Sequence, residues 1–304
     1  MNIIETHNLT RRFGRTEAVH ELNLVVPEGS IFALLGPNGA GKSTTIKMLM
    51  NLVAPTSGDA RVLGVDSRRL TPREREQIGY VSENQELPLW MTVGAYLDFC
   101  RPLYPNWDAA LEKTLREKFD LPADRKLKHL SRGMLMKTAL LSSLAYRPKL
   151  LVLDEPFSGL DPLVRDEFVR GLLEVSELGG WTVLISSHDI EEVERLADWI
   201  GVMDAGRLQF AESTETLLGR FRRIDVTCPS GTANLVAPPA HWLELERTGD
   251  LVRFVDSRFV PGQVERDCQA KYPGATVAVG PMTLRDIFIT LARTNRKAMK
   301  GAAA

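Results

Sequence analysis

The sequence predicts an α/β protein, on the evidence of two patterns. Through residues 1–210, short apolar runs of strand length alternate with segments of helical periodicity, as in folds built on a partly parallel sheet. A glycine-rich run, Gly36–Thr44, lies between the apolar run Ile31–Leu35 and the helix-like segment Thr44–Leu52. We therefore expect a large α/β domain over residues 1–218, a small α+β domain over 224–298 and a disordered tail over 299–304.

Seven strands are expected in the large domain, each an apolar or β-branched run between turn-forming residues. In chain order they are Ile3–His7, Leu22–Val26, Ile31–Leu35, Ile78–Val81, Leu150–Asp154, Thr182–Ser186 and Trp199–Asp204. Strand signals stop between about Thr92 and Pro148, where apolar residues recur at helical spacing. This stretch, residues 92–148, is predicted to be a helical subdomain inserted into the α/β core.

The small domain is predicted to be a separate α+β unit without a catalytic cluster. Its expected elements are the strands Ile224–Cys228, Trp242–Glu246 and Leu251–Val255, a helix at about Gly262–Lys271, the strand Thr276–Val279 and the helix Leu284–Arg293. Three arginines, Arg220, Arg222 and Arg223, lie at the junction before it. They belong either to a solvated linker or to a contact for a partner or anionic lipid.

Composition excludes several classes of function. The 38 basic residues nearly balance the 39 acidic residues, so we expect no general affinity for nucleic acid. The three cysteines are too few and too widely spaced for a disulfide framework or a metal site. The segment Met1–Gly14 lacks the apolar core of a signal peptide, and no apolar run reaches the ~18–20 residues of a membrane span. We expect a cytoplasmic protein.

The run Gly36–Thr44, called the phosphate loop below, fits the pattern G-x-x-x-x-G-K-[ST] in the strand–loop–helix context that the pattern requires. Its members are Gly36, Pro37, Asn38, Gly39, Ala40, Gly41, Lys42, Ser43 and Thr44. Glycines allow a tight turn whose N–H groups face a polyphosphate, and the N-terminus of the following helix favours an anion. Lys42 supplies a positive charge to the terminal phosphates and Ser43 a hydroxyl ligand for Mg²⁺. The loop therefore predicts nucleoside triphosphate binding.

Two carboxylates follow the apolar run Leu150–Leu153, at the strand end where α/β sheets bind ligands. Asp154 is placed to hold Mg²⁺ opposite Ser43. Glu155 is placed to accept a proton from an attacking water. His188 follows another strand at the same sheet edge; it is either structural or a hydrogen-bond partner of the γ-phosphate.

These motifs, with others along residues 1–215, resemble in their order the nucleotide-binding subunit of an ATP-binding-cassette (ABC) transporter. The resemblance implies a P-loop NTPase core of the ABC type that binds ATP and Mg²⁺. Leu130–Met134 resembles the family's signature segment, whose Ser131 and Gly133 would contact nucleotide, and Ser131 would cap the following helix. Ser158–Asp161 resembles the dimer-interface loop, with Asp161 at the nucleotide, and His188 the switch histidine. Phe13 occupies the position of an aromatic that stacks on adenine.

Three residues in two segments depart from the family pattern. Arg132 replaces a glycine of the signature segment, which also has Met134 where the family usually has glutamine. Glu83, in the stretch Ile78–Glu83, stands where the family usually has a glutamine that couples the ATP site to the membrane partner. Its carboxylate is expected to be a third metal ligand, and it adds a negative charge beside the phosphates.

The resemblance implies a head-to-tail homodimer in which the signature segment of one subunit completes the ATP site of the other. It also implies a separate multi-span permease that holds the chain on the inner face of the cell membrane. The apolar run Leu87–Met91 belongs either to the core or to the surface that contacts this permease. The chain would power a transporter, and its closing segment Pro281–Phe288 resembles that of subunits of bacterial drug, antibiotic or lipid exporters of the ABC-2 type.

Two alternatives remain open. One is a non-transport member of the same superfamily that acts on ribosomes or DNA. The other is a nucleotide-gated scaffold with slow turnover, which the altered Arg132 and Glu83 positions would permit.

Overall fold

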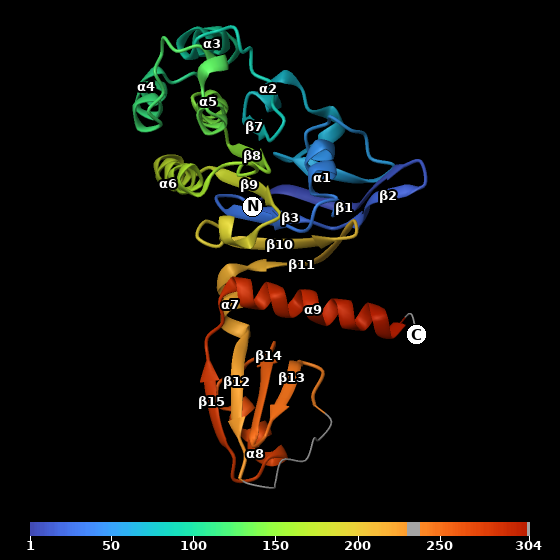
Figure 1. Ribbon diagram of the computed structural model, residues 1–304. Coiled ribbons are helices and arrows are strands. Elements are labelled where there is room, and N and C mark those ends of the chain that lie inside the picture. The colour runs from blue at the N-terminus through green and yellow to red at the C-terminus, as the bar shows by residue number, and fades with distance from the viewer. Residues whose placement is uncertain (230–237, 303–304) are drawn as a thin grey trace. The chain divides into compact units, whose positions relative to one another are not determined.

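The computed structural model describes residues 1–229 and 238–302, with the backbone alone at 174–179 and 295–302. The chain divides into two compact units, Met1–Ala211 and Glu212–Ala304. The division lies a few residues before the boundary expected at 218. Most helices and strands are labelled in Figure 1.

A six-stranded sheet organises the first unit, in the order β11-β10-β4-β9-β8-β7. The strands are β4 (Ile31–Leu35), β7 (Ile78–Ser82), β8 (Leu150–Asp154), β9 (Thr182–Ser187), β10 (Trp199–Asp204) and β11 (Arg207–Ser213). The five strands from β10 to β7 run parallel, and every residue of β4, β8 and β9 is buried. Because parallel strands end at a common edge, the loops after β4, β7, β8 and β9 converge there.

The second sheet of this unit is antiparallel and joins β2-β1-β5-β6, with β3 also paired to β1. Its strands are β1 (Asn2–Phe13), β2 (Thr16–Leu22), β3 (Val25–Pro27), β5 (Ser57–Val62) and β6 (Val65–Asp66). The single strand expected at Leu22–Val26 was wrong. The Thr6 hydroxyl donates to Leu22 O at 2.8 Å and accepts from Leu24 N at 2.7 Å, so a side chain interrupts the backbone ladder there.

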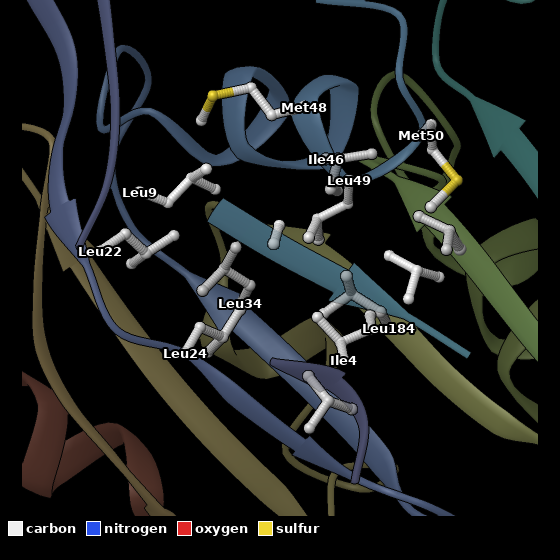
Figure 2. Close-up of a cluster of buried hydrophobic side chains, with 14 of the residues drawn as sticks. Ile4, Leu9, Leu22, Leu24, Leu34, Ile46, Met48, Leu49, Met50 and Leu184 are labelled. Carbon is white, nitrogen blue, oxygen red and sulfur yellow. The ribbon is translucent and has the colours of Figure 1, made fainter. Parts of the chain in front are cut away.

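One hydrophobic core joins the two sheets through helix α1 (Lys42–Leu49) (Figure 2). Ile46 and Leu49 from α1 pack with Leu34 of β4, Leu184 of β9 and Ile4 of β1, and all five are fully buried. This packing holds the helix that follows the phosphate loop against the central strands. The loop is therefore anchored at both ends.

The predicted helical insert is confirmed between β7 and β8. Its helices are α3 (Val93–Cys100), α4 (Ala109–Lys118) and α5 (Arg132–Leu144), with short 3-10 turns at Arg101–Leu103 and Leu127–His129. The side chains of Thr92, Asp108 and Ser131 accept hydrogen bonds from the first turns of the three helices, which explains where each begins. The remaining helical segments of this unit are Ser67–Arg69, α2 (Pro72–Arg75), α6 (Pro162–Gly179) and Ile190–Glu192.

The second unit contains a four-stranded antiparallel sheet in the order β13-β14-β12-β15. Its elements are α7 (Thr214–Arg220), β12 (Arg222–Thr227), β13 (Trp242–Thr248), β14 (Leu251–Asp256), α8 (Gln263–Lys271), β15 (Thr276–Gly280) and α9 (Leu284–Ala302). Its core contains Trp242 stacked on Phe254 at 4.0 Å between ring centroids. The helix α9 reaches Ala302 where a disordered tail was expected from 299; residues 303–304 lie outside the described residues.

Two expectations from composition can be compared with the structure. Cys100, Cys228 and Cys268 are all buried and free. Among the helices of residues 1–229 and 238–302, none has the length and apolar character needed to cross a membrane.

Candidate active site

At two positions the phosphate loop combines a positive φ with a close contact that only glycine permits. Gly36 has φ 159°, and a Cβ there would lie 2.2 Å from Met203 O. Gly41 has φ 100°, and its Cβ would lie 2.4 Å from Ala18 O. These contacts exclude any larger residue, so the neighbouring loops determine the path of the chain around Lys42.

The Lys42 ammonium lies at the centre of this loop. It donates to Gly36 O at 2.7 Å and to Pro37 O at 3.3 Å, and lies 3.0 Å from Glu155 Oε1. The side chain is only 4% exposed. A buried cation is stable only when it is paired, and here one carboxylate and two carbonyls pair with it.

Asp154 and Ser43 meet at the end of β8. Asp154 Oδ1 accepts hydrogen bonds from Ser43 Oγ at 2.9 Å and from Ser186 Oγ at 2.8 Å. The same Ser186 Oγ accepts from Glu155 N at 2.9 Å. Ser186 was not among the predicted site residues, although it ends a predicted strand at the sheet edge where ligands bind.

The Glu155 carboxylate lies between two basic side chains. Its Oε1 contacts Lys42, and its Oε2 lies 2.8 Å from His188 Nδ1. The Glu155 backbone is left-handed, with φ 51°, a conformation that costs free energy in a non-glycine residue. His188 is thus a partner of Glu155 in this structure, whereas its contact with a γ-phosphate stays a prediction.

Glu83 joins this edge through its backbone, because Glu83 N donates to Asp154 O at 2.9 Å. Its carboxylate Oε1 accepts from Ser158 Oγ at 2.6 Å and from Arg132 Nη2 at 3.2 Å. Its predicted role as a metal ligand stays a prediction. The contacts with Ser158 and Arg132 were not foreseen, since they depend on a fold that brings three distant segments together.

Ser131 and Gly133 have structural contacts of their own. Ser131 Oγ accepts from Met134 N at 3.2 Å, which confirms the predicted cap of α5. A Cβ at Gly133 would lie 2.2 Å from Val164 Cγ1, so this glycine allows α5 to approach α6. In the part of the chain that the structure describes, no hydrogen bond or ion pair joins either residue to the phosphate loop.

The last two predicted nucleotide contacts lie elsewhere on the unit. Asp161 Oδ1 accepts from Leu163 N and Val164 N, both at 3.1 Å, and so caps α6. Phe13 ends β1 with 47% of its surface exposed, and the Arg11 guanidinium lies 4.4 Å from its ring centroid. Both nucleotide roles stay predictions.

A buried carboxyl lies close to His188. Glu192 accepts a hydrogen bond from Ser187 Oγ, and its Oε1 lies 3.2 Å from Arg165 Nη1. Burial raises the pKa of the Glu192 carboxyl above its ordinary value, and the Ser187 hydrogen bond and the Arg165 charge oppose that rise only in part.

Proteins of known family resemble this chain in sequence and in fold. Residues 19–158 match the family described as ABC transporter. The bacitracin transport ATP-binding protein BcrA of Enterococcus faecalis is 32% identical over 275 residues, which cover 87% of this chain and 88% of that protein. The probable multidrug ABC transporter ATP-binding protein YbhF of Escherichia coli K12 is 40% identical over 211 residues. That match covers 68% of this chain but only 36% of YbhF.

A solved structure, titled as the ATP binding subunit of an ABC transporter, superposes with a TM-score of 0.63 at 27% identity. The superposition covers 71% of this chain and 91% of that one.

We predict that Ser186→Ala destabilises the protein by about 1–3 kcal/mol, since it leaves Glu155 N–H and part of Asp154 without a buried partner. Urea unfolding measures the change. The exposed Ser57 supplies the control Ser57→Ala, which should fall within about 0.5 kcal/mol of the parent. Equal effects of the two substitutions would contradict the role of Ser186.

The raised pKa of Glu192 predicts a pH dependence of stability. The folded state holds this proton more tightly than the unfolded state, so the contribution is complete below the ordinary carboxyl pKa and is lost as pH rises through the folded value. Relative to Glu192→Gln, the parent should lose unfolding free energy as pH increases from about 4 to 7. Parallel pH profiles of the two proteins in urea unfolding would refute this assignment.

Proposed function

The chain belongs to the ABC transporter family, and on this premise we propose that it is the ATP-hydrolysing subunit that powers a membrane transporter, with Glu155 as the general base. One observation carries the proposal. The Glu155 carboxylate lies at the end of β8, bonded to the phosphate-loop Lys42 on one side and to His188 on the other. A base, a phosphate-binding cation and an orienting histidine thus meet at one point.

ATP binding would begin at Lys42. The β- and γ-phosphates offer the ammonium stronger partners than the Gly36 and Pro37 carbonyls that it contacts in this structure. Backbone N–H groups of the loop and the N-terminus of α1 would hold the remaining phosphate oxygens. As Lys42 turns to phosphate, Glu155 Oε1 is released and becomes available to a water molecule.

Hydrolysis then requires a proton acceptor. Water attacks the γ-phosphorus, the bond to the β-phosphate oxygen breaks, and Glu155 takes the proton from the water. His188 holds Glu155 Oε2, which leaves Oε1 to face the nucleophile. The products are ADP and inorganic phosphate.

The residues at the site fit Mg²⁺ bound with substrate. Ser43 Oγ and Asp154 Oδ1 lie together, and residues 1–229 and 238–302 contain no group of three or more His, Cys, Asp or Glu side chains that could hold a metal by themselves. Mg²⁺ commonly binds through one or two protein oxygens together with phosphates and water, and it neutralises phosphate charge. Ser43 and Asp154 would hold it, with Glu83 as the third oxygen ligand.

We further propose that the chain works as a head-to-tail homodimer. Ser131 lies at the N-terminus of a 13-residue helix, where a capping hydroxyl and free N–H groups suit an anion. No described contact joins it to the phosphate loop of its own chain, so an ATP site in a second copy is its natural target. Asp161 and Phe13 would complete the nucleotide contacts. ATP closes this dimer and hydrolysis lets it open.

A permease partner is supported by the surface beside Glu83. Leu89 and Trp90 are 49% and 71% exposed, so neither belongs to the core. Leu89 also lines a groove of about 370 Å³ with Glu83, Arg132, Leu135 and Met136. We expect an apolar segment of the membrane partner to bind in this groove. The relatives BcrA and YbhF, named for bacitracin transport and as a probable multidrug transporter, favour an exporter at the inner face of the membrane.

We predict that Glu155→Gln lowers ATP turnover by ~10²–10⁴ and retains ATP binding, because the amide keeps the shape of the base but cannot accept the proton. Steady-state phosphate release and equilibrium binding of labelled ATP measure the two effects. Unchanged turnover would remove Glu155 from the role of base.

Affinity purification in detergent from native membranes tests the transporter itself. A multi-span protein should co-purify in stoichiometric amount, as identified by mass spectrometry. Recovery of the chain alone, or with ribosomes or DNA, would reject the proposed partner and favour a non-transport ABC ATPase.

A further inference from the structure

Two of the three residues that depart from the ABC pattern, Glu83 and Arg132, contact each other. Arg132 Nη2 lies 3.2 Å from Glu83 Oε1, although 48 residues separate them along the chain and they lie on different elements. Glu83 directly follows β7, and Arg132 is the first residue of α5. Glu83 therefore supplies the carboxylate of this ion pair and Arg132 supplies the cation.

The Glu83 end of this pair is joined to the catalytic edge of the sheet. Its backbone N–H donates to Asp154 O at 2.9 Å. Ser158 Oγ donates to the same Glu83 Oε1 at 2.6 Å, and Ser158 N donates to Glu155 O at 3.2 Å. Glu83 is thus bonded, directly or through one serine, to both carboxylate-bearing residues of the site.

The Arg132 end is joined to the signature segment Leu130–Met134. Arg132 lies between Ser131, which caps α5, and Gly133, which packs on Val164. Its guanidinium also lies against Gly159, where a Cβ would be 2.7 Å from Nη1. Gly159 has φ 67°, so the loop after β8 presents a surface without a side chain to the arginine.

A solvated surface ion pair is the simpler interpretation, because the Arg132 side chain is 50% exposed. Exposed pairs add little to overall stability. This pair, however, connects the ATP site with the signature segment. Its effect should therefore appear in the response of the signature segment to nucleotide at the ATP site. The strength typical of exposed pairs corresponds to about a two- to fivefold effect on such a response.

We propose that Glu83 and Arg132 form a positioning pair that couples the chain's own ATP site to its signature segment. The inference rests on the proposed function, in which that segment serves the ATP site of the second copy. Nucleotide bound at the phosphate loop shifts Asp154 and Glu155. Glu83 moves with them because it is hydrogen-bonded to Asp154 and Ser158. Through its contact with Glu83, Arg132 then shifts the start of α5. Each subunit thereby links the two ATP sites of the dimer.

Amide hydrogen exchange of the full chain, measured with ADP and Mg²⁺ as the probe, tests the pair. ADP lacks the γ-phosphate proposed to close the dimer, and light scattering selects a concentration at which the chain is monomeric. Peptides over 36–44 report binding, and peptides over 130–137 report the coupled response. In the parent, saturating ADP should slow exchange in the first region and change it in the second.

The variants Arg132→Ala and Glu83→Gln should each reduce the ADP-dependent change at 130–137 by about two- to fivefold, and the double variant should reduce it no further. Arg132→Lys should restore part of the response because it keeps the charge. Arg147→Ala is the matched control, since Arg147 is 49% exposed and pairs with Asp108 at 2.8 Å in the same unit. It should leave the response intact.

The outcomes separate the two proposals. No ADP effect at 36–44 in the parent would reject the proposed function and, with it, the coupling. An ADP effect at 36–44 without one at 130–137 would overturn the coupling alone. The coupling would also be overturned by an equal response in Arg132→Ala and the parent, or by an equal loss in Arg147→Ala.

Discussion

The buried charge of Lys42 is the constraint on which the rest of the site depends. An ammonium that is almost wholly buried must find anionic or carbonyl partners, or the unit would not be stable. Gly36 and Pro37 turn their carbonyls inward, and Glu155 adopts a left-handed backbone beside it. The loop and Glu155, the proposed base, are therefore arranged around one cation.

The parallel sheet makes this arrangement possible. The loops after β4, β7, β8 and β9 meet because these strands end at one edge. The loop after β4 supplies Lys42, that after β7 supplies Glu83, that after β8 supplies Glu155, and the end of β9 supplies Ser186. Ser186 is the least conspicuous of these residues, yet it bonds both Asp154 and Glu155. These bonds position the Asp154 carboxylate and the Glu155 backbone at the end of β8.

The departures at Glu83 and Arg132 meet in one ion pair of this chain. The family pattern that the motifs resemble has a glutamine and a glycine, both neutral, at these two positions. Here opposite charges meet within hydrogen-bond reach, and the same carboxylate oxygen also binds Ser158. The added negative charge of Glu83 is thus offset by a positive charge that the same chain provides.

The sequence by itself determined the motifs and the class of the fold. Strands β4, β8 and β10 begin and end at the predicted residues. A short, continuous apolar run bounded by turn-forming or charged residues is typical of a buried strand. The phosphate loop and the cap at Ser131 were likewise predictable, since each depends on residues adjacent along the chain. The strands β5 and β6 were missed because their pairing with β1 and with each other, rather than their composition, makes them strands.

Only the tertiary structure decided that Ser186 bonds Asp154, that His188 holds Glu155 and that Arg132 meets Glu83. Each contact joins segments distant in sequence, and its geometry follows from the convergence of strand ends, which no local pattern records.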